Sequence, residues 1–270
     1  WFTKSKFKNQ EMKWDSPFGE GYPGWHLECS AMSSKYLGKQ FDIHTGGIDH
    51  IQVHHTNEIA QSESCFGKKP WVKYWLHNEF LVLEKEKMAK SKGNLLTLQT
   101  LIEKGYNPLA YKYFLLGTHY RKPITFSFKA LDSAQNTYEK LKNKVLEMLE
   151  QPEVGKENTE TYIEDFQVAI NDDLNIPKAL GTIWQMLRNE KVNNAKKYKT
   201  LIEFDRVLGL ELETIKVEKL SKTIQNLIDQ REHARLNKHW QDADKLRDQL
   251  KEKGYLIEDI FEKMWGFKII

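Results

Sequence analysis

The stretch Phe41-Asp42-Ile43-His44-Thr45-Gly46-Gly47 decides the fold expected for the first part of the chain. Its apolar residues run into a glycine pair, which predicts a strand that ends in a loop. A helix is predicted from His54 to Cys65, a second strand at residues 79–83 and a further helix at residues 108–116. Strands that alternate with helices predict a parallel-sheet α/β domain. Ligands bind beyond the carboxyl ends of such strands, so we expect the site in the loops that follow them.

The sequence becomes helical from about residue 125 onward. Apolar residues recur there with helical spacing, and polar residues at 171–173 and Gly209 separate the helices. The charged segment from Leu220 to Leu250 is predicted to form two helices that turn at Asn237-Lys238. Its expected buried stripe consists of Ile224, Leu227, Ile228, Trp240, Ala243, Leu246 and Leu250. We therefore expect an α/β domain at residues 1–120, a helical bundle at 121–212 and C-terminal helices at 213–270.

Composition limits the class of protein without naming a partner. The chain carries 41 Lys and Arg against 38 Asp and Glu, and this net charge of +3 neither requires nor excludes nucleic acid. Two cysteines make no disulfide scaffold, which predicts a reduced, cytoplasmic protein. Neither a membrane span nor a signal peptide is expected. Because the chain begins at Trp1 without a methionine, we expect it to be the C-terminal portion of a longer protein.

Cys29, His54 and Glu58 are candidate metal ligands, because zinc takes thiolate, imidazole and carboxylate donors. His54 and Glu58 are four residues apart and share one face of the predicted helix. The same pair also fits a helix-surface ion pair or a core histidine. Cys65 lies seven residues beyond Glu58, about 10 Å along the helix, which is too far to share an ion. We expect Cys65 to be a small buried apolar residue.

The segment Lys87-Met88-Ala89-Lys90-Ser91 is a candidate phosphate-binding loop. Adenylyl and phosphoryl transfers need positive charge where a polyphosphate develops negative charge, and Lys87 and Lys90 supply it. Gly93 follows as a hinge. The competing interpretation is a solvated run of lysines, and composition alone favours it.

These segments resemble class I cysteinyl-tRNA synthetases in order and spacing. Gly24-Trp25-His26-Leu27-Glu28-Cys29-Ser30-Ala31-Met32 is similar to the zinc-cysteine segment of the family, and residues 46–49 with 54–63 are similar to its second metal segment. Residues 87–91 resemble its KMSKS loop. The helical half resembles the family at Gly117–Arg121, Asn171–Pro177 and Gln230–Asp248. The resemblance covers essentially all 270 residues.

The resemblance implies a partial Rossmann-like class I catalytic domain, then an all-α helical bundle and anticodon-side helices. It implies that one zinc ion per chain binds Cys29, His54 and Glu58. Trp25 and Asp49 would line the cysteine pocket, and Lys90, aided by Lys87, would contact ATP. The implied activity joins cysteine to tRNA(Cys) through an adenylate. ATP with magnesium would be a substrate, and the full-length enzyme would be monomeric. Zinc with room for another ligand would take the thiolate of cysteine and bind the hydroxyl of serine poorly.

The sequence also departs from the family pattern. Ala89 stands where the family has serine, and Val53 and Thr56 replace its usual proline and glutamate. The HIGH motif and the first zinc cysteine have no counterpart here, so we expect the chain alone not to catalyse ATP–pyrophosphate exchange. Two alternatives stay open: a ligase that joins cysteine to an amino-sugar, and a non-catalytic RNA-binding remnant.

The C-terminal segment is a candidate RNA-binding surface. Its basic residues are Arg231, Arg235, Lys238, Lys245, Arg247, Lys251 and Lys253. Such side chains can meet phosphates, and Trp240 or Trp265 can stack on a loop base. Interleaved aspartates make a plain solvated helix face the competing interpretation.

Overall fold

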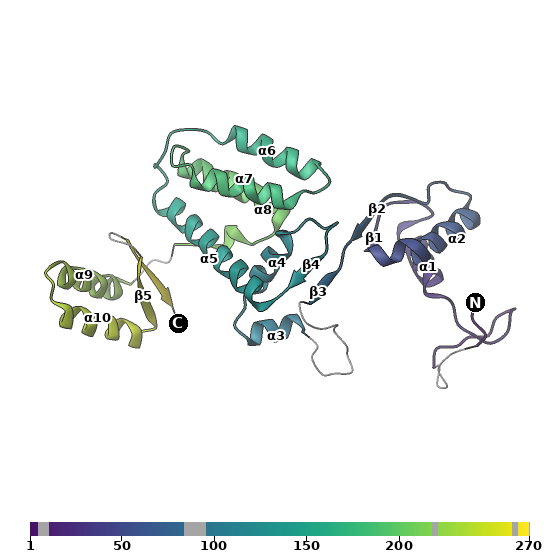
Figure 1. The fold of residues 1–270 in the computed structure, drawn as a ribbon, viewed down its shortest axis with the longest axis horizontal. Coiled ribbons are helices and arrows are strands. Elements are labelled where there is room, and N and C mark those ends of the chain that lie inside the picture. Colours follow the sequence, from purple (N-terminus) through teal and green to yellow (C-terminus); the bar gives the residue numbers. More distant parts are fainter. Residues whose placement is uncertain (5–10, 84–95, 218–220, 261–263, 270) are drawn as a thin grey trace. The chain divides into compact units, whose positions relative to one another are not determined.

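The computed structural model describes residues 1–4, 11–83, 96–217, 221–260 and 264–269 (Figure 1). Contacts divide the chain into two compact units, residues Trp1–Ile215 and Lys216–Ile270. Each unit is built around its own buried apolar residues, and each is described separately below. Among the described residues, no helix has the length and apolar content that a membrane crossing requires.

The first unit opens with a helix–strand–helix–strand arrangement that carries the candidate site. Helix α1 (Trp25–Leu37) precedes strand β1 (Phe41–Gly47), helix α2 (Thr56–Phe66) follows, and strand β2 (Val72–Asn78) pairs with β1. The two strands are parallel, in register from Phe41 opposite Val72 to Gly47 opposite Asn78. This parallel pair across a helix confirms the predicted α/β class. Strand β2 was not predicted, because lysine, histidine and asparagine interrupt its apolar residues.

A second parallel pair links this region to the helices. Strand β3 (Leu81–Leu83) pairs with β4 (Ile124–Phe126), and helices α3 (Leu98–Glu103) and α4 (Pro108–Leu116) lie between them in sequence. Helix α4 begins as predicted, with Pro108 in its first turn and the side chain of Asn107 accepting from the backbone N–H of Leu109.

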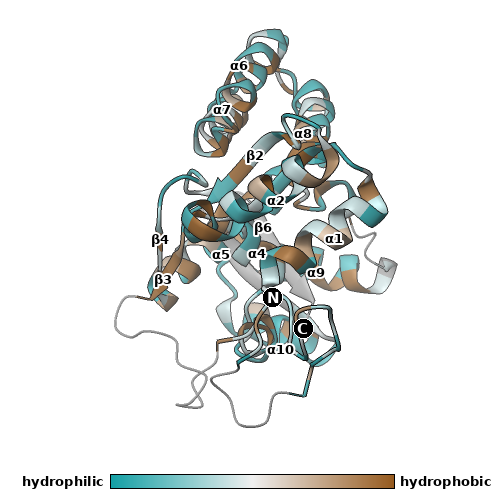
Figure 2. Cartoon of the chain, turned by 90° about the vertical axis from the view of Figure 1, so that its right-hand side faces the viewer, coloured by the Kyte–Doolittle hydropathy of each residue, from teal (hydrophilic) through white to brown (hydrophobic). Residues whose placement is uncertain are grey.

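The remaining helices of the first unit confirm the predicted helical half. They are α5 (Phe128–Glu150), α6 (Glu160–Asn171), α7 (Ile176–Arg188) and α8 (Asn194–Leu208), followed by a short turn at Leu212–Thr214. Apolar residues at helical spacing face a shared core that also includes α4. Figure 2 shows both apolar and polar colouring along α6 and α7, as amphipathic helices require.

The second unit holds α9 (Lys222–Leu236) and α10 (Trp240–Glu252), which turn where predicted, with Lys238 at φ 60°. Strands β5 (Tyr255–Ile260) and β6 (Met264–Ile269) then form an antiparallel pair, although only helices were expected here. Ile224, Ile228, Ala243 and Leu250 are buried as predicted. Trp240 is 59% exposed, so its place in the buried stripe was wrong. It is the first residue of α10, directly after the turn that joins α9 to α10.

Candidate metal centre

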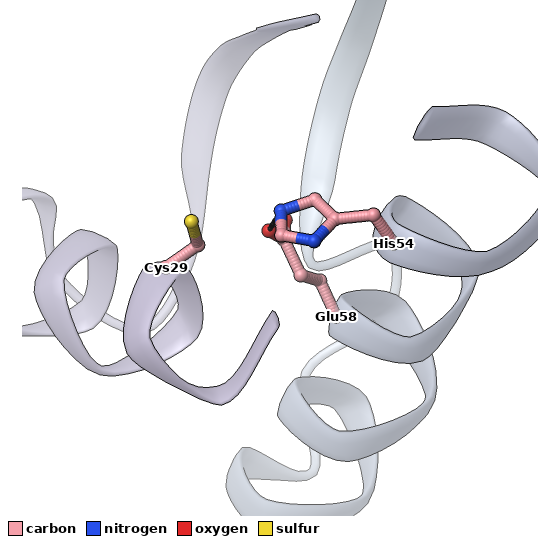
Figure 3. A group of neighbouring side chains, drawn as sticks. All are labelled: Cys29, His54 and Glu58. Carbon is pink, nitrogen blue, oxygen red and sulfur yellow. Dashed lines mark ion pairs between the residues drawn. The ribbon is translucent and has the colours of Figure 1, made fainter. Parts of the chain in front are cut away.

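Two helical segments bring the three candidate ligands together (Figure 3). Cys29 lies on α1, His54 lies in the turn before α2, and Glu58 lies in the first turn of α2. One donor atom from each of these residues lies within 4.8 Å of the others. Nε2 of His54 is 2.7 Å from Oε1 of Glu58. The structure therefore gathers the thiol, imidazole and carboxylate that the sequence suggested.

Hydrogen bonds between α1 and α2 fix the position of Cys29. Nε2 of Gln61 donates to the backbone oxygen of His26 at 2.7 Å and to Oγ of Ser30 at 2.6 Å. The hydroxyl of Ser62 donates to the same Ser30 oxygen at 3.0 Å, and both serines are buried. Because Ser30 is adjacent to Cys29, these bonds hold the thiol beside the ligands of the other segment.

A wide helical turn places two histidines at the site. Residues Ile51–His55 form a single π-helical turn before α2, and Oγ1 of Thr56 donates to the backbone oxygen of Ile51 at 2.5 Å. Such turns are rare and occur frequently at functional sites. His54 and His55 are consecutive, yet both are buried. No local sequence signal predicted this turn.

Two buried polar atoms of the site have no hydrogen-bond partner among the described residues. They are Nδ1 of His54 and Oε1 of Glu58, and Glu58 is fully buried. The 2.7 Å approach of His54 to Oε1 has ion-pair distance but lacks hydrogen-bond geometry. Leaving such an atom unsatisfied is costly, and a cation bound by Nε2 of His54 would satisfy Oε1 of Glu58. The thiol, imidazole and carboxylate donors and the unsatisfied Oε1 fit a zinc ion.

His44 holds the second oxygen of the same carboxylate. Its Nε2 donates to Oε2 of Glu58 at 2.8 Å. Burial alone would raise the pKa of Glu58, but the hydrogen bond from His44 and the nearby His44, His54 and His55 outweigh it and lower that pKa. The carboxylate therefore stays ionised, with Oε2 occupied by His44 and Oε1 facing the metal position.

Burial favours the neutral form of His54, His55 and His77. Burial lowers the pKa of His55 to about 4, aided by repulsion from His44, and burial also lowers the pKa values of His54 and His77. Nδ1 of His55 and Nε2 of His77 share a hydrogen bond at 2.8 Å. His44, His55 and Glu58 form a second group whose donor atoms lie within 4.8 Å. Neutral imidazoles are the form that binds metals.

Burial raises the pKa of the Cys29 thiol, and the nearby negative charge of Glu58 raises it further. In the absence of a metal this cysteine is therefore protonated. A bound zinc ion favours the thiolate, so metal binding would release a proton from Cys29.

The two residues expected in the cysteine pocket, Trp25 and Asp49, both contact His50. The ring of Trp25 stacks on that of His50 at 5.4 Å and meets His54 edge-on at 4.3 Å. Oδ1 of Asp49 is 3.3 Å from Nδ1 of His50. Trp25 and Asp49 are both exposed, so each presents free surface beside the metal candidates.

Other sequence-based predictions have mixed outcomes. Lys87 and Lys90 lie outside the described residues. Cys65 is exposed near the end of α2, so the expectation that it is buried was wrong. Arg231 is only 4% exposed, which removes it from the phosphate-contact candidates.

The sequence did not point to two further histidines of the site, His44 and His77. His44 ends the predicted strand just before the glycine pair, which was the available signal, whereas His77 lies on the unpredicted β2.

Two family models match parts of this chain. Residues 2–136, half of the chain, match the family model described as tRNA synthetases class I (C) catalytic domain. Residues 218–263 match a cysteinyl-tRNA ligase anticodon binding domain.

Curated relatives cover almost the whole chain. A cysteine–tRNA ligase of Treponema denticola is 44% identical over 96% of this chain and 59% of its own length. Cysteine–tRNA ligases of Borrelia hermsii and Burkholderia lata are 39% and 41% identical, over 97% and 93% of this chain and 58% and 53% of their own lengths. This chain thus spans a little over half the length of these relatives.

A solved structure shows the same fold. The agnB2 LeuRS of Agrobacterium radiobacter K84, in a ternary complex with tRNA and LeuAMS, superposes with a TM-score of 0.52 at 14% identity. The match covers 76% of this chain and 33% of that one. The chain therefore belongs to the class I (C) tRNA synthetase family.

Proposed function

We propose that this chain carries the cysteine-selecting part of a cysteine–tRNA ligase. The observation that supports this most is the Cys29/His54/Glu58 group, whose donor types and unsatisfied buried carboxylate oxygen fit a zinc ion, in a chain similar to cysteine–tRNA ligases. The reaction would proceed in two steps. An oxygen of the cysteine carboxylate attacks the α-phosphorus of ATP, and pyrophosphate leaves. A ribose hydroxyl at the 3′ end of tRNA(Cys) then attacks the acyl carbon, and AMP leaves.

Selectivity for cysteine would come from the metal candidates and the wall beside them. A zinc ion held by Cys29, His54 and Glu58 would supply a soft Lewis-acid position that binds a thiolate and binds a serine hydroxyl poorly. Glu58 stays ionised because His44 donates a hydrogen bond to its Oε2. Trp25, edge-on to His54, would cover one side of the substrate. A buried polar contact of this kind can reject the wrong amino acid without an editing site.

Lys87 and Lys90 would supply the positive charge for the triphosphate in the first step. A lysine that contacts ATP stabilises the charge that develops on the leaving pyrophosphate. Magnesium would accompany ATP as part of the substrate. These two roles rest on the resemblance of residues 87–91 to the KMSKS loop.

The second unit supports tRNA as the acceptor in preference to an amino-sugar. Trp240 is 59% exposed and Leu236 is 80% exposed at the turn between α9 and α10, which leaves an aromatic surface free for an unpaired base. Lys245 and Arg247 are exposed on α10, although they pair with Asp242 and Asp244. An enzyme with a small amino-sugar acceptor has no need of this surface.

Calorimetric titration of cysteine and serine into the zinc-loaded chain tests the proposed selectivity. We expect cysteine to bind about 100-fold or more tightly than serine, and expect the difference to disappear from the metal-free chain. Equal affinities in the zinc-loaded chain would contradict the proposal. Binding of tRNA(Cys) by the same preparation tests the acceptor separately.

A further inference from the structure

Two segments outside the metal centre are joined by a polar clasp, defined here as Tyr120, Arg121 and Asp173. The hydroxyl of Tyr120 donates to Oδ1 of Asp173 at 2.6 Å. Arg121 donates from Nε to Oδ2 at 2.5 Å and from Nη2 to Oδ1 at 3.3 Å. The guanidinium of Arg121 also lies over the ring of Tyr120, 5.2 Å from its centre. One carboxylate thus accepts three hydrogen bonds from two adjacent residues.

The turn that presents Asp173 has an unfavourable backbone. Asp173 and Leu174 have φ values of 51° and 54°, in the left-handed region. Aspartate tolerates this region, but a bulky leucine there is unusual and strained. The backbone N–H of Asn175 donates to the oxygen of Ala169 at 3.0 Å, which ties the turn to the end of α6. Such a conformation persists where the surrounding contacts demand it, and the clasp is one of those contacts.

Backbone hydrogen bonds join Tyr120 and Ile124 to the connection between β2 and β3. The backbone oxygen of Tyr120 accepts from the N–H of Glu79 at 2.8 Å, and the N–H of Ile124 donates to the oxygen of Phe80 at 3.0 Å. Glu79 lies two residues beyond His77, which shares a hydrogen bond with His55 beside the metal centre. Strand β3 then leads toward residues 84–95, which contain the two candidate ATP lysines.

Packing alone does not hold this connection. A cavity of about 330 Å³ lies beside it, lined by Asn78, Glu79, His119, Tyr120 and Leu174 among others. Fewer neighbours on that side mean fewer dispersion contacts for the loop. The connection is held there by the backbone hydrogen bonds of Glu79 and Ile124 and, through Tyr120, by the clasp.

We propose that Asp173 is a positioning residue, which holds Tyr120 and Arg121 and thereby fixes the β2–β3 connection, which lies in sequence between His77 and the candidate ATP lysines. The structural part of this inference stands on the described contacts. Its consequence for ATP rests on the proposed function.

Hydrogen exchange of the full chain tests the structural part, with Asp173→Asn as the variant. Asparagine keeps the tolerance for the left-handed region but loses the charge. Because the clasp is partly exposed, we expect about three- to tenfold faster exchange at residues 79–83. We expect unchanged exchange in α5 and α8. Asp172→Asn is the matched control, and it should leave residues 79–83 unchanged. Leu174→Gly relieves backbone strain without touching the clasp, and should also leave them unchanged.

Unchanged exchange at residues 79–83 in Asp173→Asn, or equal acceleration throughout the first unit, would overturn the inference. Equilibrium binding separates it from the proposed function. We expect Asp173→Asn to weaken ATP binding while the affinity of the zinc-loaded chain for cysteine stays unchanged. Faster exchange with unaltered ATP affinity would overturn the link to the lysines. Failure of the unsubstituted chain to bind ATP would instead contradict the ATP role proposed for Lys87 and Lys90, and the exchange result would still decide the role of the clasp.

Discussion

Glu58 and His44 are 14 residues apart in sequence, yet Oε2 of the buried carboxylate accepts a hydrogen bond of 2.8 Å from Nε2 of the histidine. Strand β1 carries His44 and helix α2 carries Glu58, so this bond joins the parallel β1–β2 layer to the site. The bond fixes which oxygen of Glu58 remains for a metal.

Replacing His44 by glutamine should weaken zinc binding by about 10- to 100-fold, because the carboxylate loses the partner that orients and ionises it. Competition with a chromophoric chelator measures the affinity. His239→Gln, an exposed histidine of the second unit, is the control and should have no effect. Equal affinity in His44→Gln would show that Glu58 does not depend on this bond.

Gly46→Ala should disturb the metal centre through His55. A Cβ added at Gly46 would lie 2.5 Å from Cε1 of His55, so the buried ring must move. We expect a loss of about 1–3 kcal/mol in the free energy of unfolding, measured by denaturant titration, together with weaker zinc binding. Gly181→Ala is the matched control, because its Cβ would meet no described atom within 4 Å. It lies within α7 and should stabilise the protein by about 0.5–1 kcal/mol.

Tyr138 should make stability fall in strong alkali. Burial raises its pKa to about 12, and the charges of Glu139, Asp205 and Glu211 add to this, whereas the unfolded value is about 10. A raised folded pKa gives stability that is fully present below pH 10 and is lost as the pH rises through 12. Tyr138→Phe should reduce this dependence, at a cost of about 1 kcal/mol for the lost hydrogen bond to Leu210. Unfolding titrations between pH 9 and pH 12 measure it, and identical slopes in both proteins would refute the assignment.

Trp240→Ala should weaken binding of tRNA(Cys) by about 5- to 150-fold, the range expected for one base stacked on an aromatic ring. Binding must be compared at one salt concentration, because phosphate contacts are salt-dependent. Leu236→Ala is the control, since Leu236 is exposed nearby but has no ring. Unaltered affinity in Trp240→Ala would place the base contact elsewhere.

Regular helices were predictable because their signals are local. Pro108 at the first turn marks where α4 begins, and apolar residues at helical spacing mark α5. Strand β2 and the pair β5–β6 were missed, since mixed polar residues hide strands whose pairing is decided by distant segments. Trp240 and Cys65 are exposed and Arg231 is buried because of which face of each helix packs against a neighbouring element. A short stretch of sequence does not encode which face that is.

The candidate site was predictable only in part, for the same reason. His54 and Glu58 share a helix face, so their spacing was visible in the sequence. His44 and His77 join them through the parallel register of β1 and β2, which no local spacing encodes. The wide turn at Ile51–His55 added a further buried histidine that periodicity did not suggest.

Cobalt(II) substitution tests the central claim most directly, namely that Cys29, His54 and Glu58 form a metal centre that takes the thiolate of cysteine. The cobalt-loaded chain should show a thiolate-to-metal absorption band from Cys29, and added cysteine should increase it while serine should not. Cys29→Ser should lose the initial band. No change on adding cysteine, or the same change with serine, would contradict the account.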